Sequence, residues 1–477
     1  MSTVRRVAKN AGALFLGNNL TKILTFVLTI FLARYLKDVG FGKLSFAIEF
    51  TALFAVLIDF GINVIIIREV ARNKDETSKY LGNALTLKFF LSIIALALIY
   101  FAINLMGYPP ETRMAVYIAA LIIIVQSFAV IFESVFQAFE HMEYGMFAKI
   151  LRVLLRLALT LPILFLGYGV IAVLLIYLFV SVVNLMMYAV ICTRKIIIPK
   201  FNFDFSFIKH LLKKSWSFAF MSVFTVLYMK IDITMLSKMQ SDAVVGWYSA
   251  AYNLIFSLEY IPIAIGGALL PVAAVLYKNR DKMIMIYERM FRFLFSFTFP
   301  IAVGTTLLAD KIILLIYGND FINSIVALQI LIWVILINFT LYASSVVLIA
   351  LNKERQGMYV QLVCAIVNVV LNLIVIPKLS YIGASITTII SAIVFFVIVY
   401  FLLKKYLYTP PILRMIYKPI FAGLLMGLAV YYLSFLNLFV VIALGAVIYA
   451  GIMYLIGAIT EEDKEILFKI IGGKQAQ

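Results

Sequence analysis

The sequence predicts an all-α polytopic membrane protein with about 14 transmembrane helices. Apolar residues make up 65% of the 477 positions and charged residues only 13%. Soluble globular proteins are near half apolar and about a quarter charged. Long apolar stretches recur along the whole chain, and one short sequence pattern occurs twice within them. Lipid is therefore expected to be the main solvent of this chain.

Windows of about 20 residues locate the individual spans. Backbone groups in hydrocarbon must be satisfied within their own segment, so each long apolar span is expected to be a helix. The break between the fifth and sixth spans rests on Gly167-Tyr168-Gly169 alone. The predicted spans are 11–33, 41–67, 81–106, 114–138, 148–166, 169–192, 216–238, 244–275, 286–308, 322–350, 358–377, 381–403, 415–433 and 437–459.

The positive charge follows the predicted loops. The net charge is +17, which could suggest a nucleic-acid partner. However, 29 of the 40 Lys and Arg residues fall in the N-terminal arm, the even-numbered loops and the tail, against 7 in the other loops. This asymmetry is the positive-inside signature, so it predicts cytoplasmic termini and a multi-pass protein of the cell membrane. It also explains the charge without nucleic acid.

A ten-residue pattern, Asp-x-x-x-Gly-x-x-Ser-x-Ala, begins at Asp38 and again at Asp242, 204 positions later. Six crossings separate the copies, so the repeats would be parallel, a known plan for transporters with a site between two lobes. We therefore predict an N-lobe over 1–200 with helices 1–6, and a C-lobe over 201–408 with helices 7–12. Residues 409–477 would add helices 13 and 14 and a cytoplasmic tail.

The pattern itself has a structural interpretation. Each aspartate can cap the helix that follows by accepting its free amides. The glycine and serine put small residues on one helical face, which lets a neighbouring helix approach closely. Two turns beyond each glycine, the same offset aligns Glu49 with Asn253. We expect the motif to pack and cap helices rather than to carry chemistry.

Ionisable residues inside the spans are the candidate functional groups. Each costs about 2.5–3.5 kcal/mol at the bilayer centre on insertion scales, so several should face a wet interior. Asp59 and Glu133 lie toward helix ends and are expected to be structural partners of nearby bases. The nine candidates are Lys22, Lys88, Arg156, Lys230, Glu49, Asp59, Glu133, Asp232 and Glu259.

The four bases are the predicted site for an anionic phosphate in a central cavity. Lys22 and Lys230 lie deep in equivalent helices, and each could instead pair with Glu49 or Asp232. Arg156 ends a stripe with Lys149 and Arg152, and its guanidinium fork suits phosphate oxygens. Lys88 is about seven residues into its span, so it could equally snorkel to the surface.

A second set of polar residues could bind the sugar or couple transport to an ion. Asp232 and Glu259 could pair with Lys230 or bind a coupling cation. Asn368 and Asn372, at i and i+4, could hydrogen-bond a sugar or hold helices together. The polar and coupling candidates are Glu49, Asp232, Glu259, Asn253, Asn368 and Asn372, with Na⁺ or H⁺ as the coupling ion.

Several signatures of enzymes are missing from the sequence. It has only two histidines, and no metal-ligand cluster, phosphate-binding glycine loop or nucleophile elbow. We therefore expect no catalytic residue, no metal and no cofactor. The short outer loops, of about ten residues, leave no room for a membrane glycosyltransferase or polymerase site. The driving force would be an ion gradient, the membrane potential or the gradient of the substrate.

The order and spacing of these motifs resemble a known family. The run from Leu32 to Ala47, then Asp59-Phe60-Gly61 and Arg68 to Arg72, resembles the N-terminal signature of polysaccharide biosynthesis proteins. Those proteins are the Wzx-type O-antigen and repeat-unit flippases of the multidrug/oligosaccharidyl-lipid/polysaccharide (MOP) exporter superfamily. In the second half, Asp232, the run from Asp242 to Ala251, the run from Asn368 to Pro377 and Gly383-Ala384 agree with it.

The resemblance implies a V-shaped bundle of fourteen helices that works by alternating access. Its substrate would be a polyprenyl-phosphate or polyprenyl-diphosphate oligosaccharide, moved from the cytoplasmic to the outer leaflet for surface polysaccharide or glycoprotein biosynthesis. Glycan-assembly enzymes would be the protein partners, and we expect a monomer in the bilayer. The alternatives are an ion-coupled multidrug antiporter and a flippase for peptidoglycan-precursor lipid.

Overall fold

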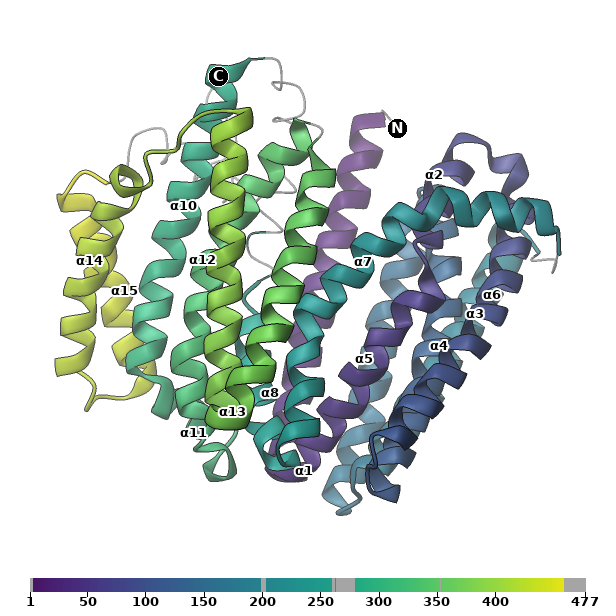
Figure 1. The fold of residues 1–477 in the computed structure, drawn as a ribbon, viewed down its shortest axis with the longest axis horizontal. Coiled ribbons are helices and arrows are strands. Elements are labelled where there is room, and N and C mark those ends of the chain that lie inside the picture. Colours follow the sequence, from purple (N-terminus) through teal and green to yellow (C-terminus); the bar gives the residue numbers. More distant parts are fainter. Residues whose placement is uncertain (1–2, 199–202, 260–261, 263–278, 352, 459–477) are drawn as a thin grey trace. The chain divides into compact units, whose positions relative to one another are not determined.

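The computed structural model describes residues 3–198, 203–259, 262, 279–351 and 353–458. Its described part consists of helices and connecting turns, without a β-strand. This confirms the predicted all-α class (Figure 1). The α-helices are α1 Thr3–Asp59, α2 Ile62–Arg72, α3 Thr77–Leu105, α4 Pro110–Ala138, α5 Met142–Phe165, α6 Val170–Lys195, α7 Phe205–Met239, α8 Asp242–Phe256, α10 Arg280–Leu307, α11 Ala309–Ile316, α12 Ser324–Ala350, α13 Glu354–Tyr406, α14 Ile412–Tyr432 and α15 Leu438–Leu455, with single 3-10 turns η1 Lys74–Glu76 and η2 Asn319–Phe321.

Ten helices of the described part are long and apolar enough to cross a membrane. Two of them contain a sharp break, at Lys37 in α1 (φ 56°) and at Ser380 in α13 (φ 52°). Each break separates two predicted spans, so ten helices account for twelve spans. α5 corresponds to span 148–166, and α8 begins span 244–275, much of which lies outside the described residues.

The weakest predicted boundary, between the fifth and sixth spans, is confirmed. α5 ends at Phe165 and α6 begins at Val170. Gly167 makes the turn with a φ of 80°, in the left-handed region that glycine adopts without a steric penalty. One glycine therefore ends one crossing and starts the next.

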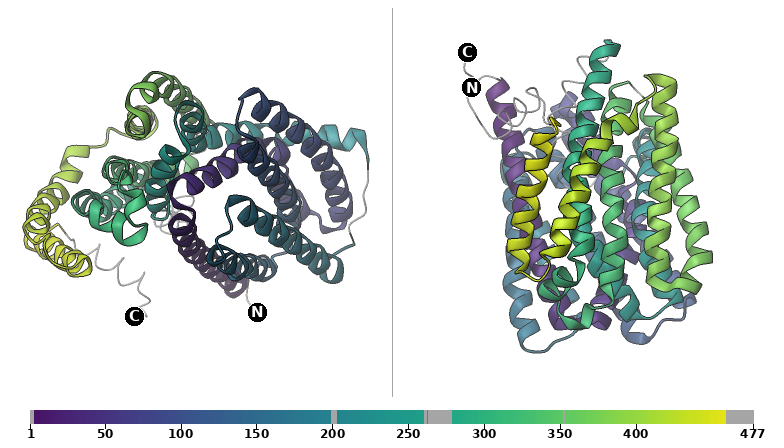
Figure 2. Two further views of the ribbon diagram at one scale, coloured as in Figure 1. Left: turned by 90° about the horizontal axis from the view of Figure 1, so that it is seen from below. Right: turned by 90° about the vertical axis from the view of Figure 1, so that its left-hand side faces the viewer.

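The chain divides into two compact units. The first comprises residues 1–253, 317–321 and 361–387, and the second 254–316, 322–360 and 388–477. Within each unit the long helices run side by side (Figure 2). In the first unit, the two halves of α1 pack with α4, α5 and α7. A buried apolar cluster joins α2, α3, α4 and α6. The predicted lobe boundaries at 200 and 408 stay predictions.

In the second unit, α10 packs between α12 and α14. Gly423 and Gly427 of α14 permit this, because a Cβ at either position would overlap Phe299 or Val303 of α10. Small residues that let helix backbones approach are the usual contact device in membranes. The two predicted C-terminal helices correspond to α14 and α15.

Candidate functional site

The two copies of the repeated motif pack against each other in the first unit. A Cβ built on Gly42 would collide with the backbone carbonyl of Asp242, and one on Gly246 would collide with the carbonyl of Asp38. Each glycine thus makes room for the aspartate of the other copy. The predicted packing role is confirmed, and the contact is reciprocal, as expected for a duplicated segment. It joins the second half of α1 to the start of α8.

The predicted capping role is only partly right. Asp38 accepts a hydrogen bond from the amide of Val39, but its other oxygen accepts one from the indole Nε1 of Trp247 at 3.0 Å. At α8 the amide of Val244 donates to Ser241, not to Asp242. Burial raises the pKa of the Asp242 carboxyl, an effect opposed by the nearby charge of Lys43. The Asp38 side chain thus links the two motif copies.

Two turns from the glycine contact, about 10 Å along α1, Glu49 forms an ion pair with Lys230 of α7. The Oε1 to Nζ distance is 2.9 Å, and the side chains are only 19 and 22% exposed. The structure therefore supports the alternative that Lys230 pairs with an acid. The Lys230 ammonium also lies 6.0 Å from the ring centroid of Tyr252.

Asp232, also on α7, is the centre of a buried polar cluster. Its carboxylate accepts hydrogen bonds from the hydroxyl of Tyr248 at 2.9 Å and from Nδ2 of Asn372 at 2.6 Å. Asn372 Nδ2 also donates to Asn368 Oδ1 at 3.1 Å, and Thr387 donates to Asn372 Oδ1. The cluster joins α7, α8 and both sides of the break in α13.

This cluster has the composition of a site for a small cation. Asp232 is 3% exposed, and Asn368, Asn372 and Thr387 are fully buried. One carboxylate among neutral amide and hydroxyl oxygens suits a hard cation of low charge. The buried Nδ2 of Asn368 has no hydrogen-bond partner within the described residues, and as a donor it does not itself favour a cation. Within the described residues, no group of three or more His, Cys, Asp and Glu side chains could hold a metal ion.

Arg156 lies on α5 against α6. Its guanidinium is 4.3 Å from the ring centroid of Tyr177, and its Nη2 is 3.5 Å from Ser181 Oγ. Its Nε is buried and has no hydrogen-bond partner within the described residues, and the same holds for Arg152 one turn earlier. The guanidinium is thus held by an aromatic face and a hydroxyl, with donors left over for an anion.

The other end of the basic stripe is neutralised. Lys149 forms an ion pair with Glu133 of α4 at 2.5 Å, which confirms the expectation that Glu133 is a structural partner. Lys22, half-buried on α1, lies close enough to Lys149 for their charges to interact. The structure therefore brings Lys22 and the α5 stripe into one region of the first unit.

Lys88 of α3 has three partners. Its ammonium donates to Asp59 at 3.0 Å, to Asn63 Oδ1 at 3.1 Å and to the Ser127 carbonyl at 3.0 Å. The side chain is fully buried, so it does not snorkel to the surface. All three ammonium protons are used, which makes this a structural ion pair, as expected for Asp59. Lys88 is thus a poorer phosphate ligand than Arg156.

Two candidates remain, Glu259 and Asn253. Glu259 belongs to the second unit, where Asn338 of α12 donates to its Oε1 at 2.6 Å. Asn253 is half-buried near the end of α8. The structure thus pairs Glu49 with Lys230. It places Asp232 with the two asparagines of α13, whereas Glu259 belongs to the second unit.

Sequence reasoning missed four aromatic or hydroxyl partners: Tyr177, Trp247, Tyr248 and Thr387. The repeat itself held a signal for two of them. At the 204-residue offset, Trp247 and Tyr248 align with Lys43 and Leu44. The motif copies differ at the two positions that bind Asp38 and Asp232. Tyr177 and Thr387 carried no comparable signal, because either is ordinary in a membrane helix.

Comparison with known proteins assigns the family. The sequence profile described as "Polysaccharide biosynthesis protein" matches residues 7–277, more than half of the chain. The chain belongs to this family. The profile described as "MatE" matches residues 218–374. The polysaccharide biosynthesis family is part of the MOP exporter superfamily, so the resemblance stated from the motifs is confirmed, and the protein is a multi-pass membrane transport protein.

Individual relatives agree with this family. The uncharacterized membrane protein MJ1068 of Methanocaldococcus jannaschii is 22% identical over 439 residues, 85% of this chain and 86% of that protein. The lipid II flippase MurJ, in an inward closed conformation, is similar in structure with a TM-score of 0.78 and 16% identity, over 94% of this chain and 98% of that one. An inward-facing multidrug resistance MATE family transporter matches with a TM-score of 0.68 and 17% identity, over 81% of this chain and 95% of that one. At these identities the structures establish the fold.

Proposed function

We propose that this polysaccharide biosynthesis protein is a flippase for a polyprenyl-phosphate or polyprenyl-diphosphate oligosaccharide, moving it from the cytoplasmic to the outer leaflet of the cell membrane by alternating access. The observation that carries the proposal is the setting of Arg156. A guanidinium inside a membrane bundle, with a buried donor left without a partner, favours an anionic ligand. Arg152, one turn earlier on α5, adds positive charge near it.

The pairing of three intramembrane acids supports an anionic rather than a cationic substrate. Glu49, Asp59 and Glu133 each form an ion pair with a lysine. Paired carboxylates offer little attraction to an organic cation, whereas Arg156 has no acidic partner among its described contacts. This charge pattern argues against a multidrug antiporter, the function suggested by the "MatE" match.

We further propose that the Asp232 cluster takes up the coupling ion, Na⁺ or H⁺. Its carboxylate accepts hydrogen bonds from neutral donors on α8 and α13. Broken helices with free polar groups are typical ion sites of transporters. Binding there would bias the arrangement of α7, α8 and the two parts of α13.

The test is reconstitution in liposomes with a fluorescent short-chain polyprenyl-diphosphate disaccharide, whose exposure to an external quencher reports translocation. The wild type should translocate it, and Arg156→Ala should lower the rate at least roughly tenfold, because the bidentate phosphate contact is lost. Arg156→Lys should retain part of the rate, since the charge stays but the fork is lost. Equal rates for wild type and Arg156→Ala would refute the role of Arg156.

The same liposomes separate the alternatives. The structural similarity to a lipid II flippase favours peptidoglycan-precursor lipid as a second candidate. A pentapeptide-bearing lipid translocated faster than the disaccharide lipid would support that substrate. Drug efflux by the reconstituted protein, without lipid translocation, would instead support the antiporter.

A further inference from the structure

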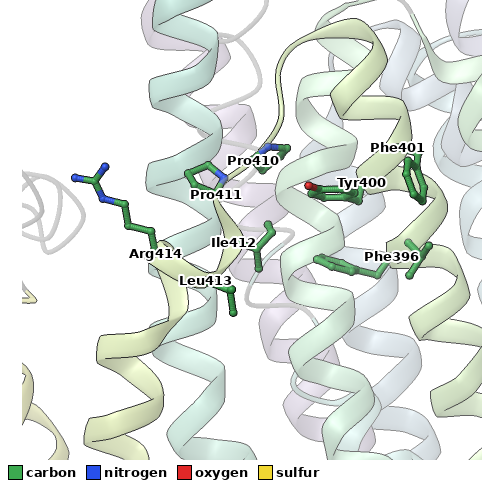
Figure 3. A pocket seen from close by; sticks show the side chains of 9 residues that line it. Phe396, Tyr400, Phe401, Pro410, Pro411, Ile412, Leu413 and Arg414 are labelled. Atoms are coloured by element: carbon green, nitrogen blue, oxygen red, sulfur yellow. The ribbon is translucent and has the colours of Figure 1, made fainter.

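Two adjoining hollows meet at one arginine in the second unit. The larger, with a volume of about 760 Å³, is formed by the end of α13 and the start of α14. Phe396, Tyr400, Phe401 and Pro410 contribute apolar surface to it (Figure 3). The smaller, of about 210 Å³, lies among α10, α14 and the end of α15. Arg414 contributes to both.

The smaller hollow is strongly basic. Arg292 of α10 and Arg414 and Lys418 of α14 contribute to its wall, together with the polar residues Ser296 and Tyr417. No acidic side chain is among its described lining residues. Lys418 donates to the carbonyl of Gly457 at 2.8 Å, which fixes its position without neutralising its charge. Three positive charges around one small hollow favour an anion.

The larger hollow has the opposite character. Its lining is almost entirely apolar and aromatic, and its volume falls within the range of about 300–1,000 Å³ typical of ligand sites. In Figure 3 the side chain of Arg414 extends away from Phe396 and Tyr400, on the other side of the α14 start. Arg414 thus lines both the apolar hollow and the basic hollow.

We propose that these hollows together bind one anionic phospholipid of the surrounding bilayer. The phosphate would lie among Arg292, Arg414 and Lys418, and one hydrocarbon chain would occupy the apolar hollow. Position supports a lipid: α14 begins and α15 ends here, at the predicted cytoplasmic boundary of the membrane. Basic pockets between helices at this boundary are suited to lipid headgroups. The site is separate from Arg156 and does not depend on the proposed substrate.

The test measures lipid binding to the purified full-length protein by native mass spectrometry. The probes are dioleoylphosphatidylglycerol, which is anionic, and dioleoylphosphatidylcholine, which is not. We expect the wild type to prefer the anionic lipid and Arg414→Gln/Lys418→Gln to bind it roughly tenfold or more weakly, because two cations are removed. Inorganic phosphate at millimolar concentration should not displace the lipid; displacement would indicate a site for free phosphate and overturn the proposal.

A matched control removes the same charge nearby. Lys404 and Lys405 are exposed in the last turn of α13 and do not line either hollow. Lys404→Gln/Lys405→Gln should bind phosphatidylglycerol within about twofold of the wild type, since its surface potential changes equally but the pocket is intact. An equal loss in both double variants would mean general surface attraction and overturn the proposal.

The apolar hollow is tested separately, with a variant that keeps every charge. Val397→Trp should fill it and weaken binding of the dioleoyl lipid, but not of the dihexanoyl form, whose short chains need little of the space. Unchanged binding of both lipids would contradict the site for the hydrocarbon chain.

An alternative occupant of the basic hollow is an acidic segment of the protein itself, since Glu461, Glu462 and Asp463 follow in the sequence. If the lipid bound only to the variant Glu461→Gln/Glu462→Gln/Asp463→Asn, these acids would be the occupant and the proposal would fail.

Discussion

At the scale of single residues, hydrogen-bond partners separate charges that are already satisfied from charges that are not. Lys88 has all three protons engaged, whereas Arg156 has a buried donor without a partner. Both are basic residues in apolar helices, so phosphate binding was predicted for both from the sequence. A buried ion pair whose donors all have acceptors is part of the folded bundle. A buried cation with a donor that lacks an acceptor would be stabilised by binding an anionic ligand.

Lys88→Met should therefore affect stability more than any specific binding step. It removes a fully buried cation and leaves Asp59 unpaired, so we expect a loss near 3 kcal/mol in the free energy of unfolding, at the low end for buried pairs because Asp59 is 35% exposed. The double variant Lys88→Met/Asp59→Asn should recover part of the loss. Thermal unfolding of Lys88→Met, Asp59→Asn and the double variant in detergent measures this, and additive losses would contradict a direct pair.

Asp232→Asn should uncouple transport from the ion gradient. The amide keeps the size of the carboxylate but not its charge, so the cluster can no longer balance a cation or hold an acidic proton. We expect translocation in liposomes to lose its dependence on an imposed Na⁺ or H⁺ gradient. Glu111→Gln, at an acid that is 56% exposed in a salt bridge with Lys43, is the control and should keep that dependence.

At the scale of helices, two kinds of backbone device organise the first unit. The reciprocal glycine contact brings α1 and α8 together, and breaks at Lys37 and Ser380 turn α1 and α13 back into the membrane. The glycines were recognisable because the pattern is repeated. The breaks were expected from polar loops, but their positions at a lysine and a serine follow from the tertiary packing of the segments on either side.

Gly42→Ala and Gly246→Ala should each destabilise the protein by about 1–3 kcal/mol, because the added methyl meets backbone that cannot rotate away. Gly304→Ala is the matched control. It lies inside α10 with nothing within 4 Å of its Cβ position, so it should gain about 0.5–1 kcal/mol from reduced backbone entropy in the unfolded chain. Chemical denaturation would measure both; a similar change in all three variants would contradict the close contact.

Lys37→Gly and Ser380→Gly should stabilise the two breaks. Both residues have positive φ with an extended ψ, a region that only glycine populates easily and that costs other residues on the order of 1–3 kcal/mol. The greater entropy of glycine in the unfolded state offsets part of this, so we expect a net gain of up to about 1 kcal/mol. A lower thermal midpoint in both variants would show that these side chains, rather than the backbone, stabilise the turns.

At the scale of the whole molecule, the charge distribution predicts the orientation in the membrane. It predicts that the termini and the basic hollow of the second unit face the cytoplasm and that the break at Lys37 faces the outside. The family assignment agrees with a multi-pass protein. Orientation is therefore a property of the loops as a set, and no single helix determines it.

Cysteine labelling in intact cells tests this orientation. Cys192 and Cys364 are both buried, so replacing them with alanine should give a background without reactive thiols. Val39→Cys should react with a membrane-impermeant maleimide in intact cells, because Val39 is 46% exposed beside the outer break. Ser2→Cys should react only after permeabilisation; labelling in intact cells would reverse the topology.

The sequence by itself determined that the chain is surrounded by lipid. It also determined where the helices run, where most of them end, and that the chain contains an internal duplication. Apolar length, loop charge and a repeated motif are local or periodic properties, so they can be read along the chain. It also located the charges worth examining. Only the tertiary structure decided their roles, since an ion pair joins residues far apart in sequence: Glu49 meets Lys230, Asp59 meets Lys88, and Asp232 gathers Tyr248 and Asn372. Burying a charge in the membrane is costly, and its partner decides whether that cost is already offset or awaits a ligand.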